Sequence, residues 1–125
     1  LSLLPMTISL LILILFRFVF LLGYVPTASM EPALKTGSLL LGVRVWGDIQ
    51  KGDIIVFQHN KEYLVKRVEA VEGDLIESNG ENLVVPEGGF YVLGDNGQCS
   101  YDSRYWEYPF VMNDDIVAKV ILPTR

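Results

Sequence analysis

Three separate stretches of the sequence carry polar side chains of kinds that can do chemistry. Ser29 stands in "VPTASMEPALKTG", directly after a long apolar run, where neither a flexible linker nor an alternating strand is the pattern. Lys66 stands in "YLVKRVEAV", and the third stretch is "SYDSR" at 100–104. A serine hydroxyl becomes a good nucleophile when a base takes its proton, so the identity of that base is the first question.

Histidine is the usual base for a serine nucleophile, but the histidine of this sequence stands in a stretch that does not suit that role. The single histidine, His59, lies in the polar stretch "HNKE" and is expected to be a solvated turn residue. The sequence has neither an HExxH nor a CxxC motif, and its one cysteine is Cys99. We therefore expect no zinc site, no cofactor and no intramolecular disulfide.

Lys66 is the alternative base. On a strand, alternate side chains share a face, so Lys66 is the one charge on a face that it shares with Leu64, Val68 and Ala70. Burial lowers the pKa of a lysine, and a neutral amine can take a proton from a serine near neutral pH. The other interpretation is a lysine at the rim of a sheet with its ammonium group in water.

The stretch "SYDSR" supplies partners for such an amine. The Ser100 hydroxyl can accept a hydrogen bond from a lysine and orient it. Asp102 and Arg104 are two residues apart and can form an ion pair that fixes the loop.

An apolar segment precedes these residues. Residues 3–23 are long enough for a transmembrane helix, and their only charge, Arg17, is near enough to one end to reach the interface. The core of a cleavable signal peptide and a buried helix are the rival interpretations, but the first is usually shorter and the second needs more surrounding chain. We expect a membrane anchor over 1–24.

The remaining residues, 25–125, have the pattern of a single β domain. Short apolar runs alternate with turn signals such as "KGD", "EGD" and "SNGEN", and no helical period is sustained. The sequence predicts a mainly β fold, a catalytic sheet or barrel-like domain after one transmembrane helix. All fifteen acidic residues follow the apolar segment, and the formal net charge is −5. Such an acidic domain is a poor nucleic-acid binder.

Four blocks, in this order, give the chain a resemblance to type I signal peptidases, the membrane-anchored Ser–Lys proteases. The blocks are "SMEP", "KGDIIVF", "YLVKRVEAVEGD" and "VLGDNGQCSYDSR", and together they span nearly the whole chain. The resemblance implies a serine endopeptidase that removes signal peptides from preproteins. It also implies a single-pass membrane protein whose catalytic domain lies on the extracytoplasmic side.

The resemblance assigns a role to each matching residue. It makes Ser29 the nucleophile, Lys66 the general base and Ser100 the residue that orients the lysine. The oxyanion would be bound by the backbone N–H of Ser29 and the hydroxyl of Thr27. The residues that brace the site would be Gly94, Asp95, Asn96, Asp102 and Arg104.

An extended substrate would add as a strand beside this site, with alternate side chains entering small pockets. Family position suggests apolar walls suited to Ala-x-Ala, and the residues that would form them are Val25, Pro26, Leu34, Leu64 and Val65.

Some residues depart from the family pattern. Ala28, Thr27, Gly97 and Cys99 replace residues that are more common at their positions. Only residues 72–91 separate the lysine block from the closing block, where larger members insert a second β domain. We interpret the chain as a minimal catalytic core.

Two alternatives remain open from the sequence. Peptidases that mature conjugation pilins resemble signal peptidases and are similarly small. A membrane-anchored β domain that only binds a partner would leave Ser29 and Lys66 incidental.

Overall fold

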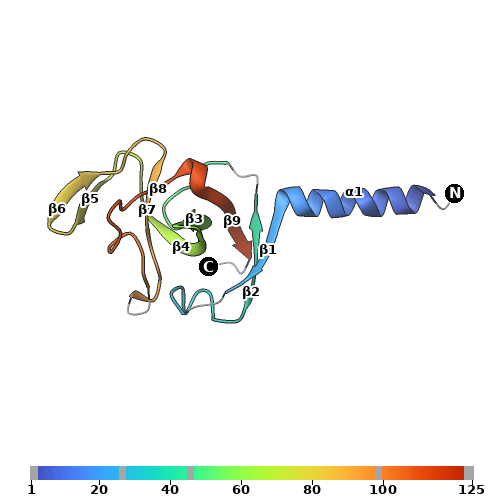
Figure 1. The fold of residues 1–125 in the computed structure, drawn as a ribbon, viewed down its shortest axis with the longest axis horizontal. Coiled ribbons are helices and arrows are strands. Elements are labelled where there is room, and N and C mark those ends of the chain that lie inside the picture. The colour runs from blue at the N-terminus through green and yellow to red at the C-terminus, as the bar shows by residue number, and fades with distance from the viewer. Residues whose placement is uncertain (1–2, 26–27, 45–46, 98–99, 123–125) are drawn as a thin grey trace.

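The computed structural model of the chain describes residues 3–25, 28–44, 47–97 and 100–122. One N-terminal helix leads into strands whose pairings are all antiparallel (Figure 1). The elements in chain order are α1 (Leu3–Val19), β1 (Phe20–Tyr24), β2 (Leu39–Val43), β3 (Ile54–His59), β4 (Glu62–Val71), β5 (Leu75–Ser78), β6 (Glu81–Val84), β7 (Gly89–Leu93), β8 (Val111–Met112), the 3-10 turn η2 (Asn113–Asp115) and β9 (Ile116–Leu122).

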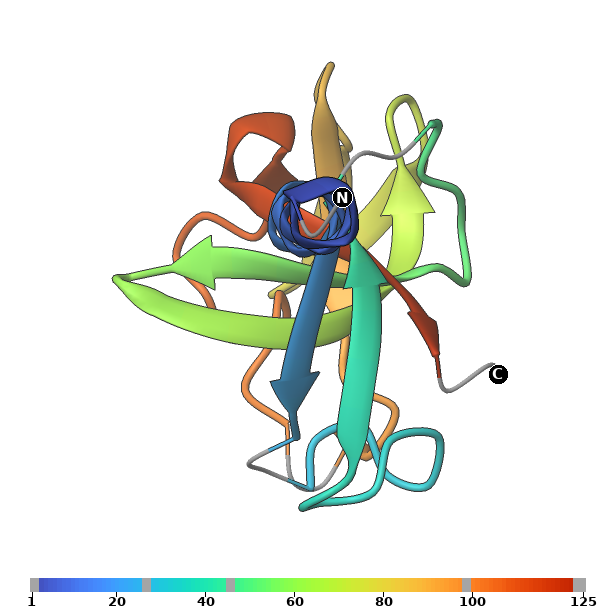
Figure 2. The same cartoon turned by 90° about the vertical axis from the view of Figure 1, so that its right-hand side faces the viewer.

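The main sheet has seven strands in the order β1-β2-β9-β3-β4-β7-β8, and β5 and β6 form a separate two-stranded ribbon. The prediction of a mainly β fold is therefore confirmed. Figure 1 shows α1 projecting from one side of the sheet and the β5–β6 ribbon at the opposite end. Viewed along α1, β1 and β2 lie side by side behind the helix (Figure 2). The short β8 and η2 were not predicted from the sequence.

The predicted helix over 3–23 is wrong in its extent, because α1 ends at Val19. Residues 20–24 instead form β1 and pair with β2, from Phe20↔Val43 to Tyr24↔Leu39. Pairing with β2 satisfies the backbone of this stretch, and Gly23 is a poor helix former. The sheet therefore begins before the predicted boundary at residue 24. Among the described residues, no helix is both long and apolar enough to cross a membrane.

β3 is the central strand because it is buried on both faces. Its successive side chains alternate between two apolar clusters. Phe57 belongs to the cluster that contains Trp106, and its neighbour Val56 belongs to the cluster that contains Met30. The segment after β7 thus packs on one face of the sheet, and the segment that carries Ser29 packs on the other.

The predicted alternation of β4 holds as far as a bulge. Leu64 and Val68 pack with the Trp106 cluster, and Lys66, which lies between them, is buried. The pairing with β7 shifts register between Val68 and Ala70, so Ala70 joins a different cluster and Val71 packs against the first one. The prediction that Ala70 shares the face of Lys66 is therefore wrong, because a bulge adds one residue to the strand.

A two-residue turn connects β3 to β4. Asn60 and Lys61 have φ angles of 50° and 68°, as a tight hairpin of this hand requires, and His59 pairs with Glu62. His59 is not a solvated turn residue as predicted. It ends β3 half-buried, and its ring stacks on Trp106 at a centroid distance of 4.0 Å and an interplanar angle of 20°.

Candidate active site

Lys66 is buried near the middle of β4. Its side chain is 3% exposed, and its cross-strand partner Ile55 is fully buried. The pairing of β4 with β7 begins only at Arg67↔Leu93, so the strand from Glu62 to Lys66 pairs with β3 alone among the described residues. Lys66 therefore stands at the last residue of an open strand edge, and its amine is shielded from water.

The Lys66 amine begins a short chain of hydrogen bonds. Its Nζ donates to Ser100 Oγ at 3.2 Å, and Ser100 Oγ donates in turn to Asp102 Oδ2 at 2.7 Å. Because the Ser100 proton is directed at the carboxylate, an oxygen lone pair is left to accept from the amine. Ser100 thus separates the amine from the carboxylate and sets the direction of one N–H bond.

The pKa of Lys66 is lowered. Burial is the largest cause, because it removes water from the ammonium form. The negative charge of Asp102 acts in the opposite direction and raises the pKa, and the positive charge of Arg104 lowers it again. The neutral amine is therefore present at a lower pH than for a lysine in water.

Asp102 is fully buried and accepts five hydrogen bonds. Arg104 donates from Nε and Nη2 at 2.9 Å each and from its backbone N–H at 3.2 Å, and Gly94 N–H and Ser100 Oγ complete the set. Burial alone acts to raise the pKa of this carboxyl group, but the hydrogen bonds from Arg104, Gly94 and Ser100 outweigh it, and the pKa is lowered. Asp102 and Arg104 are thus joined as the sequence suggested.

Ser29 lies in the turn between β1 and β2 and is 6% exposed. Its carbonyl oxygen accepts a hydrogen bond from Asn96 N–H at 2.8 Å, and the Asp95 N–H contacts Met30 Sδ at 3.4 Å. The turn after β7 therefore holds the backbone around Ser29 in place through these two contacts. Three of the residues predicted to brace the site, Gly94, Asp95 and Asn96, lie in this turn.

Gly94 is held in a space that leaves no room for a side chain. A Cβ placed on it would lie 2.6 Å from the Ser29 carbonyl oxygen and 2.6 Å from Ser100 Cβ, both far inside contact distance. Gly94 therefore sits between the segment of the serine and the segment that orients the lysine. Its backbone permits the close approach of the two.

Sequence reasoning missed the residue that fixes this turn to β4. Arg67 donates from Nε and Nη2 to the two carboxylate oxygens of Asp95, at 2.8 Å each, and from Nη1 to Gly52 O at 2.6 Å. The adjacent letters "KR" in a strand already require the two side chains to point to opposite faces. The partner of the arginine, 28 residues away, could not be identified without the fold.

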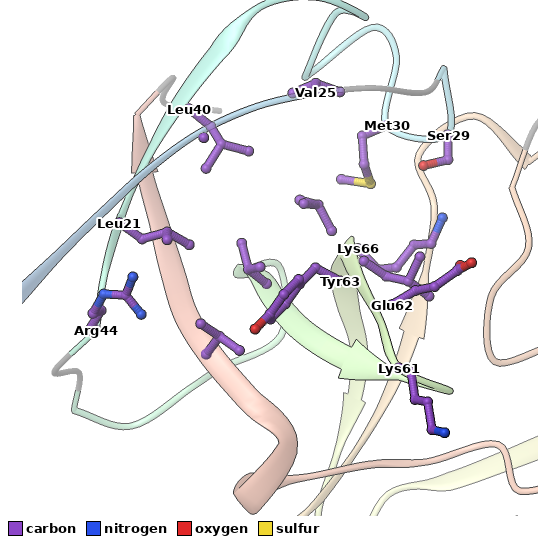
Figure 3. A pocket seen from close by; sticks show the side chains of 15 residues that line it. Leu21, Val25, Ser29, Met30, Leu40, Arg44, Lys61, Glu62, Tyr63 and Lys66 are labelled. Atoms are coloured by element: carbon purple, nitrogen blue, oxygen red, sulfur yellow. The ribbon is translucent and has the colours of Figure 1, made fainter. Parts of the chain in front are cut away.

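Ser29 and Lys66 line the same pocket, which has a volume of about 920 Å³. Figure 3 shows both at one end of it, with the Lys66 amine directed towards Ser29. Three of the predicted wall residues, Val25, Leu64 and Val65, line the pocket. Leu34 does not, since it is fully buried in the apolar cluster of Met30.

Other predicted positions lie outside the described residues, namely Pro26, Thr27 and Cys99. Sequence reasoning also missed much of the pocket wall. Leu21, Met30, Leu40, Val56 and Val117 line it, together with four polar residues, Arg44, Lys61, Glu62 and Tyr63. Leu21 comes from β1, which was expected to be part of a helix, and Leu40 comes from β2.

Comparison with known proteins gives the family. The sequence model of "Signal peptidase, peptidase S26" matches residues 1–85 and 78–124, which is nearly the whole chain. The chain belongs to the signal peptidase family. The resemblance seen in the sequence is therefore confirmed at the level of the family.

Individual members of the signal peptidase family share a low sequence identity with this chain. A signal peptidase I of Leptolyngbya laminosa is 29% identical over 135 residues, which cover 79% of this chain and 66% of that protein. A signal peptidase IB of Staphylococcus aureus is 29% identical over 138 residues, covering 74% of this chain and 71% of that protein. The match thus spans just under two thirds of the first relative.

Gly94 yields a test of the site geometry. Gly94→Ala should destabilise the protein by about 1–3 kcal/mol, because the added methyl group must displace Ser100 or the Ser29 carbonyl. Urea unfolding measures this difference. Gly97→Ala is the matched control, since its Cβ would meet only Arg104 at 3.5 Å or more, and it should change stability by roughly 0.5 kcal/mol or less. Equal effects of the two substitutions would contradict the packing described.

Proposed function

We propose that this signal peptidase family member is a serine endopeptidase that removes signal peptides from preproteins, with Ser29 as nucleophile and Lys66 as general base. The observation that carries the proposal is the buried Lys66 amine, which bonds to Ser100 and lies in one pocket with Ser29. A base must be neutral to accept a proton, and burial favours the neutral form of a lysine. No metal or cofactor takes part in the proposed reaction.

In the first step, the Lys66 lone pair takes the proton of the Ser29 hydroxyl while the serine oxygen attacks the scissile carbonyl carbon. The resulting oxyanion would accept hydrogen bonds from Ser29 N–H and the Thr27 hydroxyl, the pair that the family resemblance implies. Lys66 then returns its proton to the leaving amine, which becomes the new N-terminus of the mature protein.

The second step removes the acyl group. The ester between Ser29 and the signal peptide is attacked by water, from which Lys66 takes a proton, and the proton then returns to the serine oxygen. Throughout both steps Ser100 holds the amine, and Asp102 holds Ser100. We regard Ser100 and Asp102 as positioning residues, together with Arg104, whose charge also favours the neutral lysine.

The pocket suits an extended peptide. The segment from Glu62 to Lys66 has no strand partner on the β7 side among the described residues, so a substrate can add there as a strand. Val25 and Val65 line the same pocket and offer apolar walls to small side chains. Strand addition would bring the scissile bond to Ser29, at the end of the pocket.

We also propose that α1 attaches the domain to a lipid bilayer, with cleavage at the extracytoplasmic surface. Seven large apolar side chains of the helix are each at least 49% exposed, namely Leu4, Met6, Ile8, Leu10, Leu11, Ile12 and Leu13. They point in all directions around the helix, and this suits contact with lipid better than packing against one protein face.

The protein should therefore float with phosphatidylcholine vesicles in a density gradient. Replacing both Leu10 and Leu13 with lysine should abolish flotation, because charged side chains do not enter the hydrocarbon region without a large cost. As a control, both Leu75 and Val84, exposed apolar residues of the β5–β6 ribbon, can be replaced with lysine without loss of flotation. Flotation of the α1 variant would refute the lipid attachment.

Ser29→Ala should reduce cleavage of a signal-peptide-bearing substrate by at least about a thousandfold, because it removes the oxygen that we propose as the nucleophile. Folding should persist, with a change in stability of about 1 kcal/mol, since one buried hydroxyl is lost. Ser38→Ala, which removes a hydroxyl bonded to Lys35 O, is the matched control and should retain full activity. If wild-type protein binds the substrate without cutting it, the non-catalytic alternative is correct.

The pH dependence tests Lys66. The cleavage rate should rise with pH through a pKa below the ordinary lysine value of 10.5, because only the neutral amine accepts a proton. Lys66→Arg should be inactive, because a guanidinium stays protonated, and Lys66→Met should be inactive for lack of a base. A rate that rises only near 10.5, or an active Lys66→Arg variant, would show that Lys66 is not the base.

Stability provides an independent readout of the same pKa. Between the folded-state pKa and the unfolded value of 10.5, the unfolded chain binds a proton that the folded chain does not, so wild-type stability falls as pH falls. Lys66→Met removes this penalty. It should therefore be more stable than wild type below the folded-state pKa, and the difference should shrink as pH rises towards and beyond 10.5. Urea unfolding of both proteins over this pH range measures the difference in their free energies of unfolding.

A further inference from the structure

The end of the pocket far from Ser29 carries charge that the proposed reaction does not use. Arg44 lines the pocket and is half-buried. Figure 3 shows it beside Leu21, at the end opposite Ser29 and Lys66. The walls between the two ends are mainly apolar, with Val25, Leu40 and others on one side. A cation at the far end of an apolar groove is a feature that a bound peptide would meet.

The register of β2 explains why Arg44 reaches this pocket. Leu40 and Gly42 are alternate residues of β2 and share one face, and Arg44 is the next alternate residue, just beyond the end of the strand. Leu40 lines the pocket, and Gly42 places no side chain between Leu40 and Arg44. β2 ends at Val43, which pairs with Phe20, so Arg44 follows at the point where α1 passes into β1.

Apart from Lys66, the other charged residues that line the pocket lie away from the end of Arg44. Lys61 and Glu62 also line the pocket, at the tip of the β3–β4 hairpin. In Figure 3 the Lys61 amine points away from Leu21 and Arg44, and Glu62 lies on the Lys66 side of the pocket. Arg44 is therefore the charged pocket residue that lies at the end opposite Ser29.

The spacing of the walls indicates which substrate residue lies there. From Val25 back to Leu21, which lies beside Arg44, is four residues of extended chain, or about 13 Å at roughly 3.3 Å per residue, and this stretch forms part of the pocket wall. An extended peptide with its scissile bond at Ser29 would cover this length with its five preceding residues. Its first, third and fifth side chains share one face.

We propose that Arg44 is a specificity-determining residue that favours an acidic side chain at the fifth position before the scissile bond. A guanidinium matches a carboxylate in shape and charge, and the apolar walls around Arg44 keep water from competing fully. A lysine at the same substrate position would meet a like charge. The inference rests on the proposed function, because it takes Ser29 as the point of cleavage.

Three substrate peptides test the proposed preference of Arg44. They are identical except for Glu, Gln or Lys at the fifth position before the scissile bond, and alanine is kept at the first and third positions. Wild-type kcat/KM should be about threefold to tenfold higher for the Glu peptide than for the Lys peptide, as expected for a partly exposed charge pair. The ratio should fall towards one in 1 M salt, on the order of the concentration that screens such charges. Equal kcat/KM for the three peptides would overturn the inference.

Two variants assign the effect to Arg44. Arg44→Gln should remove the preference, and Arg44→Glu should reverse it in favour of the Lys peptide. Lys51→Gln changes the net charge by the same amount as Arg44→Gln, but it acts at a turn whose lysine pairs with Asp74, so it should keep the wild-type preference. If Lys51→Gln or Lys61→Gln removes the preference instead, Arg44 is not the residue responsible.

Binding separates this inference from the proposed catalysis. The Ser29→Ala variant should bind the Glu peptide more tightly than the Lys peptide by a similar ratio, and the additional change Arg44→Gln should remove the difference in Kd. If wild type cleaves none of the peptides while this difference in Kd is found, the proposed function fails and the role of Arg44 in binding stands. If cleavage occurs without any difference in kcat/KM or Kd, only the role of Arg44 fails.

Discussion

The buried carboxylate of Asp102 is the constraint on which the site depends. A fully buried charge is tolerated only when it is paired and hydrogen-bonded. Asp102 accepts three hydrogen bonds from Arg104, one from Gly94 N–H and one from Ser100 Oγ. To supply those donors, the chain from Gly94 to Arg104 must fold back on itself. This loop fixes Ser100 against the lysine and presses the turn at Gly94 against the backbone of Ser29.

The same arrangement reconciles two opposed requirements. Asp102 must stay charged in the interior, and its negative charge attracts a proton to Lys66. Arg104 compensates much of that charge, because it bonds both carboxylate oxygens and itself lowers the pKa of Lys66. Ser100 stands between amine and carboxylate, so the lysine meets a neutral hydroxyl instead of a direct ion pair. Burial then remains the dominant influence on the amine.

The sequence predicted features that depend on local pattern. Alternation along β4 placed Lys66 on an apolar face, and turn residues marked most of the strands. Where local pattern is ambiguous or contacts are distant, prediction failed. A short apolar run fits a helix or a strand equally well, so β1 was assigned to the helix, and the bulge that turns Ala70 away has no signal in a single sequence. The pairing of Arg67 with Asp95 arises only from the fold.

The direct passage from α1 into β1 connects the helix to the pocket wall. Val19 ends the helix and Phe20 begins the strand, so no loop residue is present at the junction to absorb a change of angle. Two residues of that strand, Leu21 and Gly23, form part of the pocket wall. The helix and this part of the groove wall therefore belong to one continuous segment of chain, and the strand that follows the helix directly places Leu21 and Gly23 in that wall.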